Sequence, residues 1–407
     1  MIYFEEMKTE PEIITSGGVT SPRGFLAGAT SAGIKNKDQR RLDLGILFSK
    51  VSCPAAAVFT TNKVKAAPVV LSQKRLQKGR ASAVIMNSGC ANACTGEQGM
   101  ADALEMTGLA ARHVGVSPED VLVASTGVIG VALPMERIRA AIPKVVLSTQ
   151  GGHDLARAIM TTDTVPKEVA VRADDYIIGG MLKGAGMIHP DLATMLCFLT
   201  TDAAIDVDFL GQALRKAVAI SFNMVSIDGD NSTNDTVLIM ANGMAGGKPV
   251  TKGSRRAEVF QQALNRTCVY LARAAARDGE GATKLIEVSV SGAASPGDAR
   301  RAARTIVSSS LVKTAVHGSD PNWGRVLAAA GRSGVALEAE KLELYIGDTR
   351  VVKDGAPVPF NKKEVVRHLD GKEVYIALNL NMGSAEATAW GCDLSEEYVK
   401  INAEYTT

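Results

Sequence analysis

Residues 183–202 place the hydroxyl of Thr194 between a glycine-rich loop and an apolar run that is typical of a buried strand. The loop is Lys183-Gly-Ala-Gly186, and its glycines make the chain pliable because they carry no Cβ. The apolar run begins at Met195. Taken alone, Thr194 is most simply a β-branched residue that opens a strand. The segment therefore predicts a buried strand entered from a pliable loop, with one hydroxyl at the junction.

That hydroxyl becomes a useful nucleophile if the chain is cut directly before it. A threonine inside a polypeptide has no base of its own. An N-terminal threonine carries an α-amine whose pKa of roughly 7.7–8.0 leaves about a tenth of it unprotonated at neutral pH. The amine can accept the hydroxyl proton, which is a recognised way to activate a weak alcohol. This chemistry requires cleavage between Ala193 and Thr194.

Length, charge and cysteine usage point to a reduced cytoplasmic protein that acts on small molecules. A chain of 407 residues is long enough for two domains. Lys and Arg number 45 against 43 for Asp and Glu, so a formal charge of +2 gives no field that favours nucleic acid or a membrane surface. The six cysteines are scattered, and no basic region followed by an apolar run opens the chain.

Neither the cysteines nor the histidines support a metal site. Cys90 and Cys94 form the one close cysteine pair, but three residues separate them and no histidine is near, so we expect two buried thiols. The five histidines are dispersed. His189 precedes Thr194 closely, but cleavage would leave it on the other chain, so a role as base is not favoured.

The first part of the chain predicts an α/β or α+β layered domain, because apolar runs typical of strands alternate with helix-like segments. Ser117-Pro-Glu-Asp120 predicts a turn that starts a helix. We expect strands at 43–48, 56–61, 82–87, 121–125 and 236–240, and helices at 98–114, 207–221 and 255–277.

The pattern restarts near residue 283, so we predict two domains, 1–282 and 283–407. No low-complexity linker marks the boundary, which favours close packing of the two parts. In the second part we expect strands at 284–291, 342–346 and 374–380, and helices at 297–314 and 361–369.

Three short motifs allow more than one interpretation from local chemistry. Ser125-Thr-Gly127 after an apolar strand can aim a hydroxyl and an N–H at one point, as an oxyanion hole does, or can be an ordinary turn. Lys183 is either a binding group or a solvated surface lysine. Its glycine loop lacks the third glycine of a dinucleotide fingerprint, since His189 stands there. Glu280, between two glycines, is ordinarily an exposed carboxylate.

Taken together, the motifs resemble the glutamate N-acetyltransferase family, also called ornithine acetyltransferase, of arginine biosynthesis. The resemblance runs from Ser21 to the last residue and includes the segment around Thr194. Its further motifs, in order, are Ser21-Pro-Arg-Gly-Phe25, Phe59-Thr-Thr-Asn62, Asn87-Ser-Gly-Cys-Ala-Asn-Ala-Cys-Thr-Gly96, Ser125-Thr-Gly-Val-Ile-Gly130, Thr161-Thr-Asp163, Asp278-Gly-Glu-Gly-Ala-Thr-Lys284, Ser319-Asp-Pro-Asn-Trp-Gly-Arg325 and Tyr398-Val-Lys-Ile-Asn402.

The resemblance implies acetyl transfer from N-acetylornithine to glutamate through an acetyl-threonine intermediate, without a cofactor. It implies self-cleavage at Ala193-Thr194 and an α2β2 heterotetramer of the two products. The implied fold is a layered α-β-β-α sandwich-like core in 1–282 with a smaller C-terminal α+β domain. Some members also accept acetyl-CoA as donor, although no motif here is a recognisable CoA pocket. The alternative function is that of a self-cleaving aminopeptidase or amidase with an N-terminal nucleophile.

The resemblance also implies a role for particular residues. Thr194 is the nucleophile, and Thr126 and Gly127 form the oxyanion hole. Lys183 binds a substrate carboxylate, and Glu280 pairs with the side-chain ammonium of the ornithine moiety. The remaining substrate-binding residues are one of Thr161 and Thr162, together with Asn402 and Thr407 in a C-terminal tail that folds back into the site.

The first prediction is that the purified protein separates into two fragments, the second of which begins at Thr194. Thr194→Ala should remain one chain because it lacks the attacking hydroxyl, whereas Thr194→Ser keeps a hydroxyl and the capacity to cut. Denaturing gels and N-terminal sequencing measure this. A Thr194→Ala protein that is still cut at the same bond would refute self-cleavage by this hydroxyl.

Overall fold

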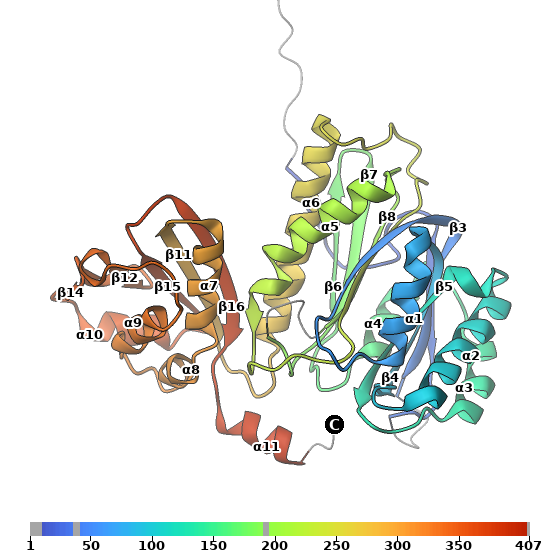
Figure 1. Ribbon diagram of the computed structural model, residues 1–407, viewed down its shortest axis with the longest axis horizontal. Coiled ribbons are helices and arrows are strands. Elements are labelled where there is room, and N and C mark those ends of the chain that lie inside the picture. The colour runs from blue at the N-terminus through green and yellow to red at the C-terminus, as the bar shows by residue number, and fades with distance from the viewer. Residues whose placement is uncertain (1–9, 36–40, 190–194, 405–407) are drawn as a thin grey trace, which may run out of the picture.

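The computed structural model describes residues 10–35, 41–189 and 195–404, and within them nine strands form one large sheet (Figure 1). The strand order is β1-β6-β7-β8-β10-β3-β4-β5, with β2 beside β3. The strands are β1 (Glu12–Ile14), β2 (Phe25–Thr30), β3 (Leu44–Phe59), β4 (Arg80–Cys90), β5 (Val121–Val128), β6 (Lys167–Ala173), β7 (Tyr176–Lys183), β8 (Leu196–Thr201) and β10 (Thr236–Ala241).

Strand β3 belongs to both halves of this sheet. Its residues 55–59 pair with β10, whereas its residues 44–48 pair with β2 and β4. The register with β4 shifts between Phe48 and Cys53. The prediction of two separate strands at 43–48 and 56–61 is therefore wrong, because the chain stays extended through this irregular stretch instead of turning.

The two halves of the sheet pack face to face, since alternate side chains of a strand point to opposite faces. Phe198 of β8 and Met86 of β4 both lie in the core between the halves. Their neighbours Leu199 and Ile85 lie in outer cores covered by helices. The predicted α-β-β-α layering is thereby confirmed. The helices of this part of the chain are α1 (Ala67–Arg75), α2 (Gly96–Val114), α3 (Met135–Ala141), α4 (Gly152–Ile159), α5 (Val207–Ala219) and α6 (Arg255–Arg277).

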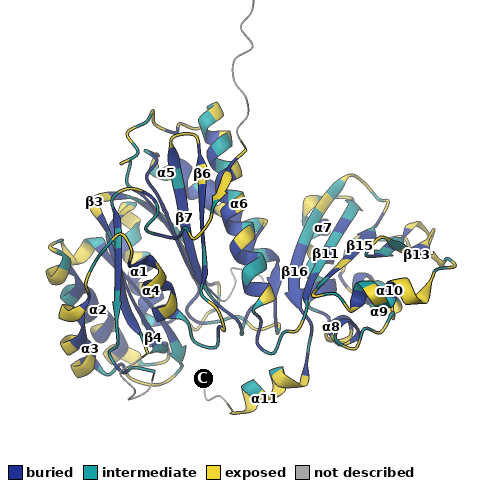
Figure 2. Cartoon of the chain, turned by 180° about the vertical axis from the view of Figure 1, so that it is seen from behind, coloured by how far each residue is buried: buried dark blue, intermediate teal, exposed yellow. Residues whose placement is uncertain are grey.

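A second sheet of seven strands lies beside the first within the described residues, in the order β14-β13-β12-β15-β11-β16-β9. Figure 2 shows that the strands of the molecule are largely buried, while the outward faces of the helices on the first sheet, such as α2 and α3, are exposed. The strands are β9 (Val225–Ser226), β11 (Leu285–Ala293), β12 (Glu343–Ile346), β13 (Thr349–Lys353), β14 (Ala356–Pro357), β15 (Glu373–Asn379) and β16 (Ala385–Cys392). The helices that follow the boundary are α7 (Pro296–Val307), α8 (Ser310–His317), α9 (Gly324–Gly331), α10 (Lys362–Leu369) and α11 (Glu396–Glu404).

The structure corrects three local predictions. The predicted helix at 297–314 is two helices, because the Ser309 hydroxyl accepts a hydrogen bond from the Val312 N–H and starts α8. The turn at 117–120 is a single 3-10 turn, Pro118–Asp120, that leads into β5 and not into a helix. Cys90 is buried as expected, but Cys94 is exposed, which corrects the expectation of two buried thiols.

The predicted domain boundary at residue 282 stays a prediction. Strand β9 precedes the boundary but pairs with β16 of the second sheet. One apolar cluster also extends from Phe260 of α6 to Leu344 of β12, so the core is continuous across the boundary. Among the described segments, no helix combines the length and apolar character needed to cross a membrane.

Candidate active site

One pocket gathers every described residue that the sequence assigned to the site. Thr126, Gly127, Thr161, Thr162, Lys183, Glu280 and Asn402 all line it. Ala193, Thr194 and Thr407 lie outside the described residues. Met195, which follows Thr194 in the sequence, is also part of the lining. Residues as far apart in the chain as Ala91 and Asn402 therefore contribute to one cavity.

Strand β5 brings Thr126 and Gly127 to the pocket at its end. Gly127 has φ of +130°, a conformation that L side chains rarely adopt. A Cβ at this position would also overlap the backbone of Gly89 and Cys90 on the neighbouring strand β4. Only glycine fits here, so the Thr126-Gly127 dipeptide is held by close backbone packing.

Asn234 is a pocket residue that the sequence analysis missed. Its side-chain amide donates hydrogen bonds to the Ala91 carbonyl at 2.7 Å and the Ser125 carbonyl at 2.8 Å. It lies in the polar stretch 228–235 before β10, so it ties one half of the sheet to the strand that carries Thr126. A polar cluster next to a buried strand was the sequence signal that could have found it.

A buried ion network supports the loop that carries Thr161 and Thr162. The Lys167 ammonium lies 2.6 Å from a carboxylate oxygen of Asp163 and 2.5 Å from one of Asp278. Asp163 also accepts hydrogen bonds from the Thr161 N–H and the Gly184 N–H. Burial alone would raise the pKa of Asp163, but the two nearby lysines and these hydrogen bonds hold it below its usual value. The network thus links the threonine loop to the glycine loop.

Lys183 stands at the end of β7 with its side chain at the pocket. Burial lowers the pKa of Lys183, and the nearby carboxylates of Asp163 and Glu280 oppose that effect. It has no ion-pair partner within the described part of the chain. This arrangement suits the binding of a negatively charged ligand by the Lys183 ammonium.

Glu280 is 8% exposed, so the ordinary alternative of a solvent-facing carboxylate does not hold. Its N–H donates to the Ala185 carbonyl at 2.8 Å, and a Cβ on Gly186 would overlap its carboxylate. The Asn402 side-chain amide donates to its Oε2 at 2.9 Å. Among the described residues Glu280 has no cationic partner within ion-pair distance. A buried carboxylate of this kind is suited to a cationic ligand.

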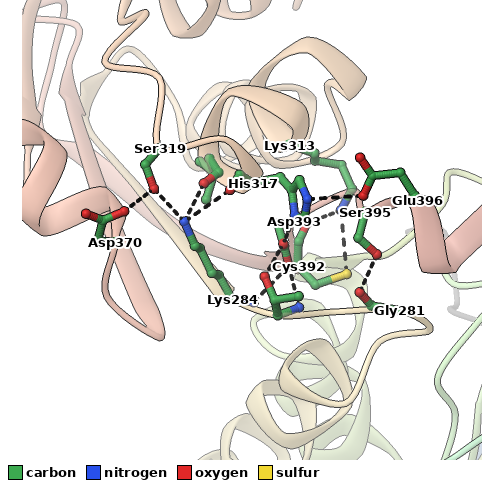
Figure 3. Close-up of polar contacts among 12 residues, drawn as sticks. Gly281, Lys284, Lys313, His317, Ser319, Asp370, Cys392, Asp393, Ser395 and Glu396 are labelled. Carbon is green, nitrogen blue, oxygen red and sulfur yellow. Dashed lines mark hydrogen bonds and ion pairs between the residues drawn. The ribbon is translucent and has the colours of Figure 1, made fainter.

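Helix α11 reaches the site because its start is fastened to the Glu280 loop. The Ser395 hydroxyl donates to the Gly281 carbonyl at 2.6 Å. Two residues before it, Asp393 accepts a hydrogen bond from the Thr283 hydroxyl at 2.6 Å and faces Nδ1 of His317 at 2.7 Å (Figure 3). Hydrogen bonds to these groups offset burial and hold the pKa of Asp393 below its usual value. These contacts bring Asn402 to the pocket.

Comparison with known proteins places the chain in a family. The model of the ArgJ family matches residues 26–407. A relative from Dehalococcoides mccartyi (strain CBDB1), named arginine biosynthesis bifunctional protein ArgJ, is 52% identical over 98% of this chain and 100% of its own length. The chain belongs to the ArgJ family. The family resemblance predicted from the sequence is thereby confirmed.

Two further ArgJ proteins support the assignment. The relative of the same name from Symbiobacterium thermophilum is 53% identical over 96% of this chain and 99% of its own length. The crystal structure of arginine biosynthesis bifunctional protein ArgJ from Bacillus halodurans is 44% identical, with a TM-score of 0.50. That alignment covers 98% of the solved chain but 51% of this one. The solved ArgJ chain therefore matches about half of this chain.

In this ArgJ chain, the segment before residue 190 is held by residues that the sequence analysis did not select. Asp228 accepts hydrogen bonds from the Met187 N–H at 2.5 Å and the Ile188 N–H at 2.9 Å. Ser226 lies 3.1 Å from Nδ1 of His189. The contact with Ser226 gives His189 a structural explanation that needs no catalytic role.

The second prediction concerns Lys167, whose loss would leave the buried carboxylates of Asp163 and Asp278 without their shared cation. Lys167→Met should lower the free energy of unfolding by about 3–5 kcal/mol at neutral pH. Because the folded pKa of Asp163 is depressed, its stabilising contribution is present above the unfolded pKa and is lost as pH falls through the folded value. The deficit should therefore shrink below about pH 4.

Urea denaturation at neutral and acidic pH measures this difference. Lys216→Met is the matched control, because Lys216 is exposed on α5. Equal stability of the two variants at neutral pH would contradict a supporting role for the network.

Proposed function

We propose that the chain transfers the acetyl group of N-acetyl-L-ornithine to L-glutamate in arginine biosynthesis. The observation that carries this proposal is the convergence, in an ArgJ family member, of Thr126, Gly127, Lys183, Glu280 and Asn402 on one pocket. The pocket holds hydroxyl and N–H donors together with one cation and one anion. It is suited to acyl transfer on an amino acid.

The charges of Lys183 and Glu280 fit the donor. N-acetylornithine carries an α-carboxylate and a side-chain ammonium on either side of its acetyl-amide. Lys183 binds the carboxylate and Glu280 binds the ammonium, each as a charge-assisted hydrogen bond. Asn402 holds Glu280 in place through the bond to Oε2. Glutamate, which has a second carboxylate instead of the ammonium, enters the same pocket after ornithine leaves.

Thr194 is the nucleophile first in self-cleavage and then in acetyl transfer. In self-cleavage its Oγ attacks the Ala193 carbonyl, the amide nitrogen leaves as the new terminal amine, and water hydrolyses the ester. The products are chains 1–193 and 194–407. Two observations support this step: Met195 lines the pocket, and the solved ArgJ chain from Bacillus halodurans corresponds to about half of this chain.

Acetyl transfer then follows a ping-pong course. The free Thr194 amine accepts the hydroxyl proton while Oγ attacks the acetyl carbon, and Thr126 and Gly127 donate to the oxyanion. The amide C–N bond breaks, and ornithine leaves with that proton on its α-amine. The α-amine of glutamate attacks the acetyl ester, the C–O bond breaks, and the Thr194 hydroxyl is restored. Removing one oxyanion donor typically costs about 3–4 kcal/mol of transition-state stabilisation.

The wider assignment follows the family. Because the ArgJ relatives are named bifunctional proteins, we include N-acetylglutamate synthesis from acetyl-CoA as a second activity. We assign the two products of cleavage to an α2β2 heterotetramer in the cytoplasm. Residues 1–282 form the catalytic domain, and residues 283–407 form a C-terminal domain whose tail completes the site.

The direct test is incubation of the processed protein with N-acetylornithine and glutamate. Ornithine and N-acetylglutamate should appear in equal amounts, and Thr194→Ala should form neither. Release of acetate and ornithine without glutamate would instead favour the hydrolase alternative.

The third prediction is that N-acetylornithine alone leaves one acetyl group on the N-terminal residue of chain 194–407. The acyl-enzyme accumulates because its acceptor is absent. Intact mass after rapid quenching detects the adduct, and initial-rate plots with both substrates should be parallel. Acetyl found only on another peptide, or plots that intersect, would exclude the ping-pong scheme.

The fourth prediction separates cleavage from transfer. Deletion of residues 402–407 should leave cleavage at Thr194 intact, since cleavage needs only the nucleophile and the oxyanion donors. It should raise the KM for N-acetylornithine or abolish transfer, because Glu280 loses the Asn402 amide.

Asn402→Ala isolates this contact, and Glu404→Ala on the same helix is its control because Glu404 is exposed. Wild-type kcat/KM in the deletion variant would remove the tail from the site.

A further inference from the structure

A second cavity adjoins the candidate active site and shares Thr161 with it. Its lining includes three cationic side chains, Lys35, Arg41 and Arg157, and one carboxylate, Asp163. The carboxylate is already bound to the Lys167 ammonium and to two backbone N–H groups. The charge that this cavity offers to a ligand is therefore positive.

The two arginine side chains make no polar contact with the rest of the described chain. Arg41 and Arg157 are exposed, and neither guanidinium has a hydrogen bond or ion pair with any described residue. A guanidinium group presents several donors in a planar fork that matches the oxygens of a phosphate. Two such groups at one cavity, with no carboxylate partner in the described ranges, form an arrangement that suits a phosphorylated ligand.

Lys35 is held in place by buried contacts. The carboxylate of Asp43, which is 1% exposed, accepts backbone N–H groups from Ala32, Ile34 and Lys35. The Lys35 ammonium donates to the carbonyls of Leu42 at 3.0 Å and Ala158 at 3.3 Å. An ammonium has three donors, so one remains for a ligand.

Close backbone packing connects Lys35 to the oxyanion strand. A Cβ on Gly89 would meet the Lys35 nitrogen at 2.7 Å and its Cα at 2.8 Å. Gly89 in turn packs against Gly127. The wall of the cationic cavity is thus connected to the strand end that carries Gly127 through Gly89 of β4. A ligand bound at Lys35 lies beside the catalytic pocket.

The electrostatics of Lys35 agree with an anion site. Burial lowers its pKa to about 8, and although Asp43 opposes this, Arg41 and Lys183 add repulsion between like charges. A bound phosphate would offset both the burial and the repulsion.

We propose that Lys35, Arg41 and Arg157 bind the phosphate groups of an acyl-thioester donor, acetyl-CoA, whose acetyl end enters the catalytic pocket past Thr161. This inference rests on the proposed function and supplies the site for its second donor. In the transfer, Thr194 Oγ attacks the acetyl carbon, a C–O bond forms and the C–S bond breaks. The hydroxyl proton, carried by the Thr194 amine, ends on the departing thiol.

The test compares donors with and without phosphates. Arg41→Gln/Arg157→Gln should raise the KM for acetyl-CoA by about tenfold for each arginine, because a charge-assisted hydrogen bond contributes about one factor of ten in affinity. The KM for S-acetylpantetheine, a thioester without phosphates, and the KM for N-acetylornithine should not change. Arg112→Gln/Arg172→Gln removes the same charge from two other exposed arginines and is the matched control.

Calorimetry with CoA, inorganic phosphate and ATP identifies the ligand. CoA should bind the wild type and lose affinity in the Arg41/Arg157 variant. The proposal is overturned if CoA does not bind, if the variant binds it normally, or if all three ligands bind equally well, since the cavity would then recognise phosphate alone.

The outcome is distinct from that of the proposed function. Failure of N-acetylornithine and glutamate to exchange an acetyl group would refute the function, whatever CoA does. Normal exchange, together with CoA affinity that is indifferent to the two arginines, would refute only the donor site.

Discussion

The buried ammonium of Lys167 is the interaction on which the candidate site most depends. Taking a lysine and two carboxylates out of water is costly, and their mutual contacts offset that cost together with the hydrogen bonds that Asp163 and Asp278 accept. The network joins the start of β6, the loop that carries Thr161 and Thr162, the loop after Lys183 and the end of α6. Because removal of Lys167 would leave two buried carboxylates without their shared cation, the network holds these four segments together.

Two backbone features then complete the pocket. Strand β3 belongs to both halves of the large sheet, so the ends of β5 and β7 approach from facing layers. Glycines allow the close approaches that follow: Gly127 against Gly89, and Gly186 against the Glu280 carboxylate. The pocket is therefore shaped by backbone contacts that any larger residue would block, and its charges are placed on those rigid contacts.

Charge divides the region into two adjacent parts that suit different ligands. The catalytic pocket pairs one cation with one anion, which suits an amino acid that carries both signs. The neighbouring cavity is positive and has two arginines without described partners, which suits phosphate. Thr161 stands between them. Under the two proposals, two acetyl donors of different chemistry use neighbouring cavities, and neither needs to occupy the other's binding groups.

The sequence by itself determined the layered α/β class, most helices and strands, and the motifs that identify the family, because periodicity and short motifs are local properties. It also selected residues such as Thr126, Lys183 and Glu280, although their roles rested on family resemblance. Only the tertiary structure decided that β3 is one strand, that Glu280 is buried, and that Asn234 and Asp228 support the pocket. It alone brought Lys35, Arg41 and Arg157 to one cavity. These features arise from contacts between residues far apart in the chain, and burial and charge pairing depend on such contacts more than on local pattern.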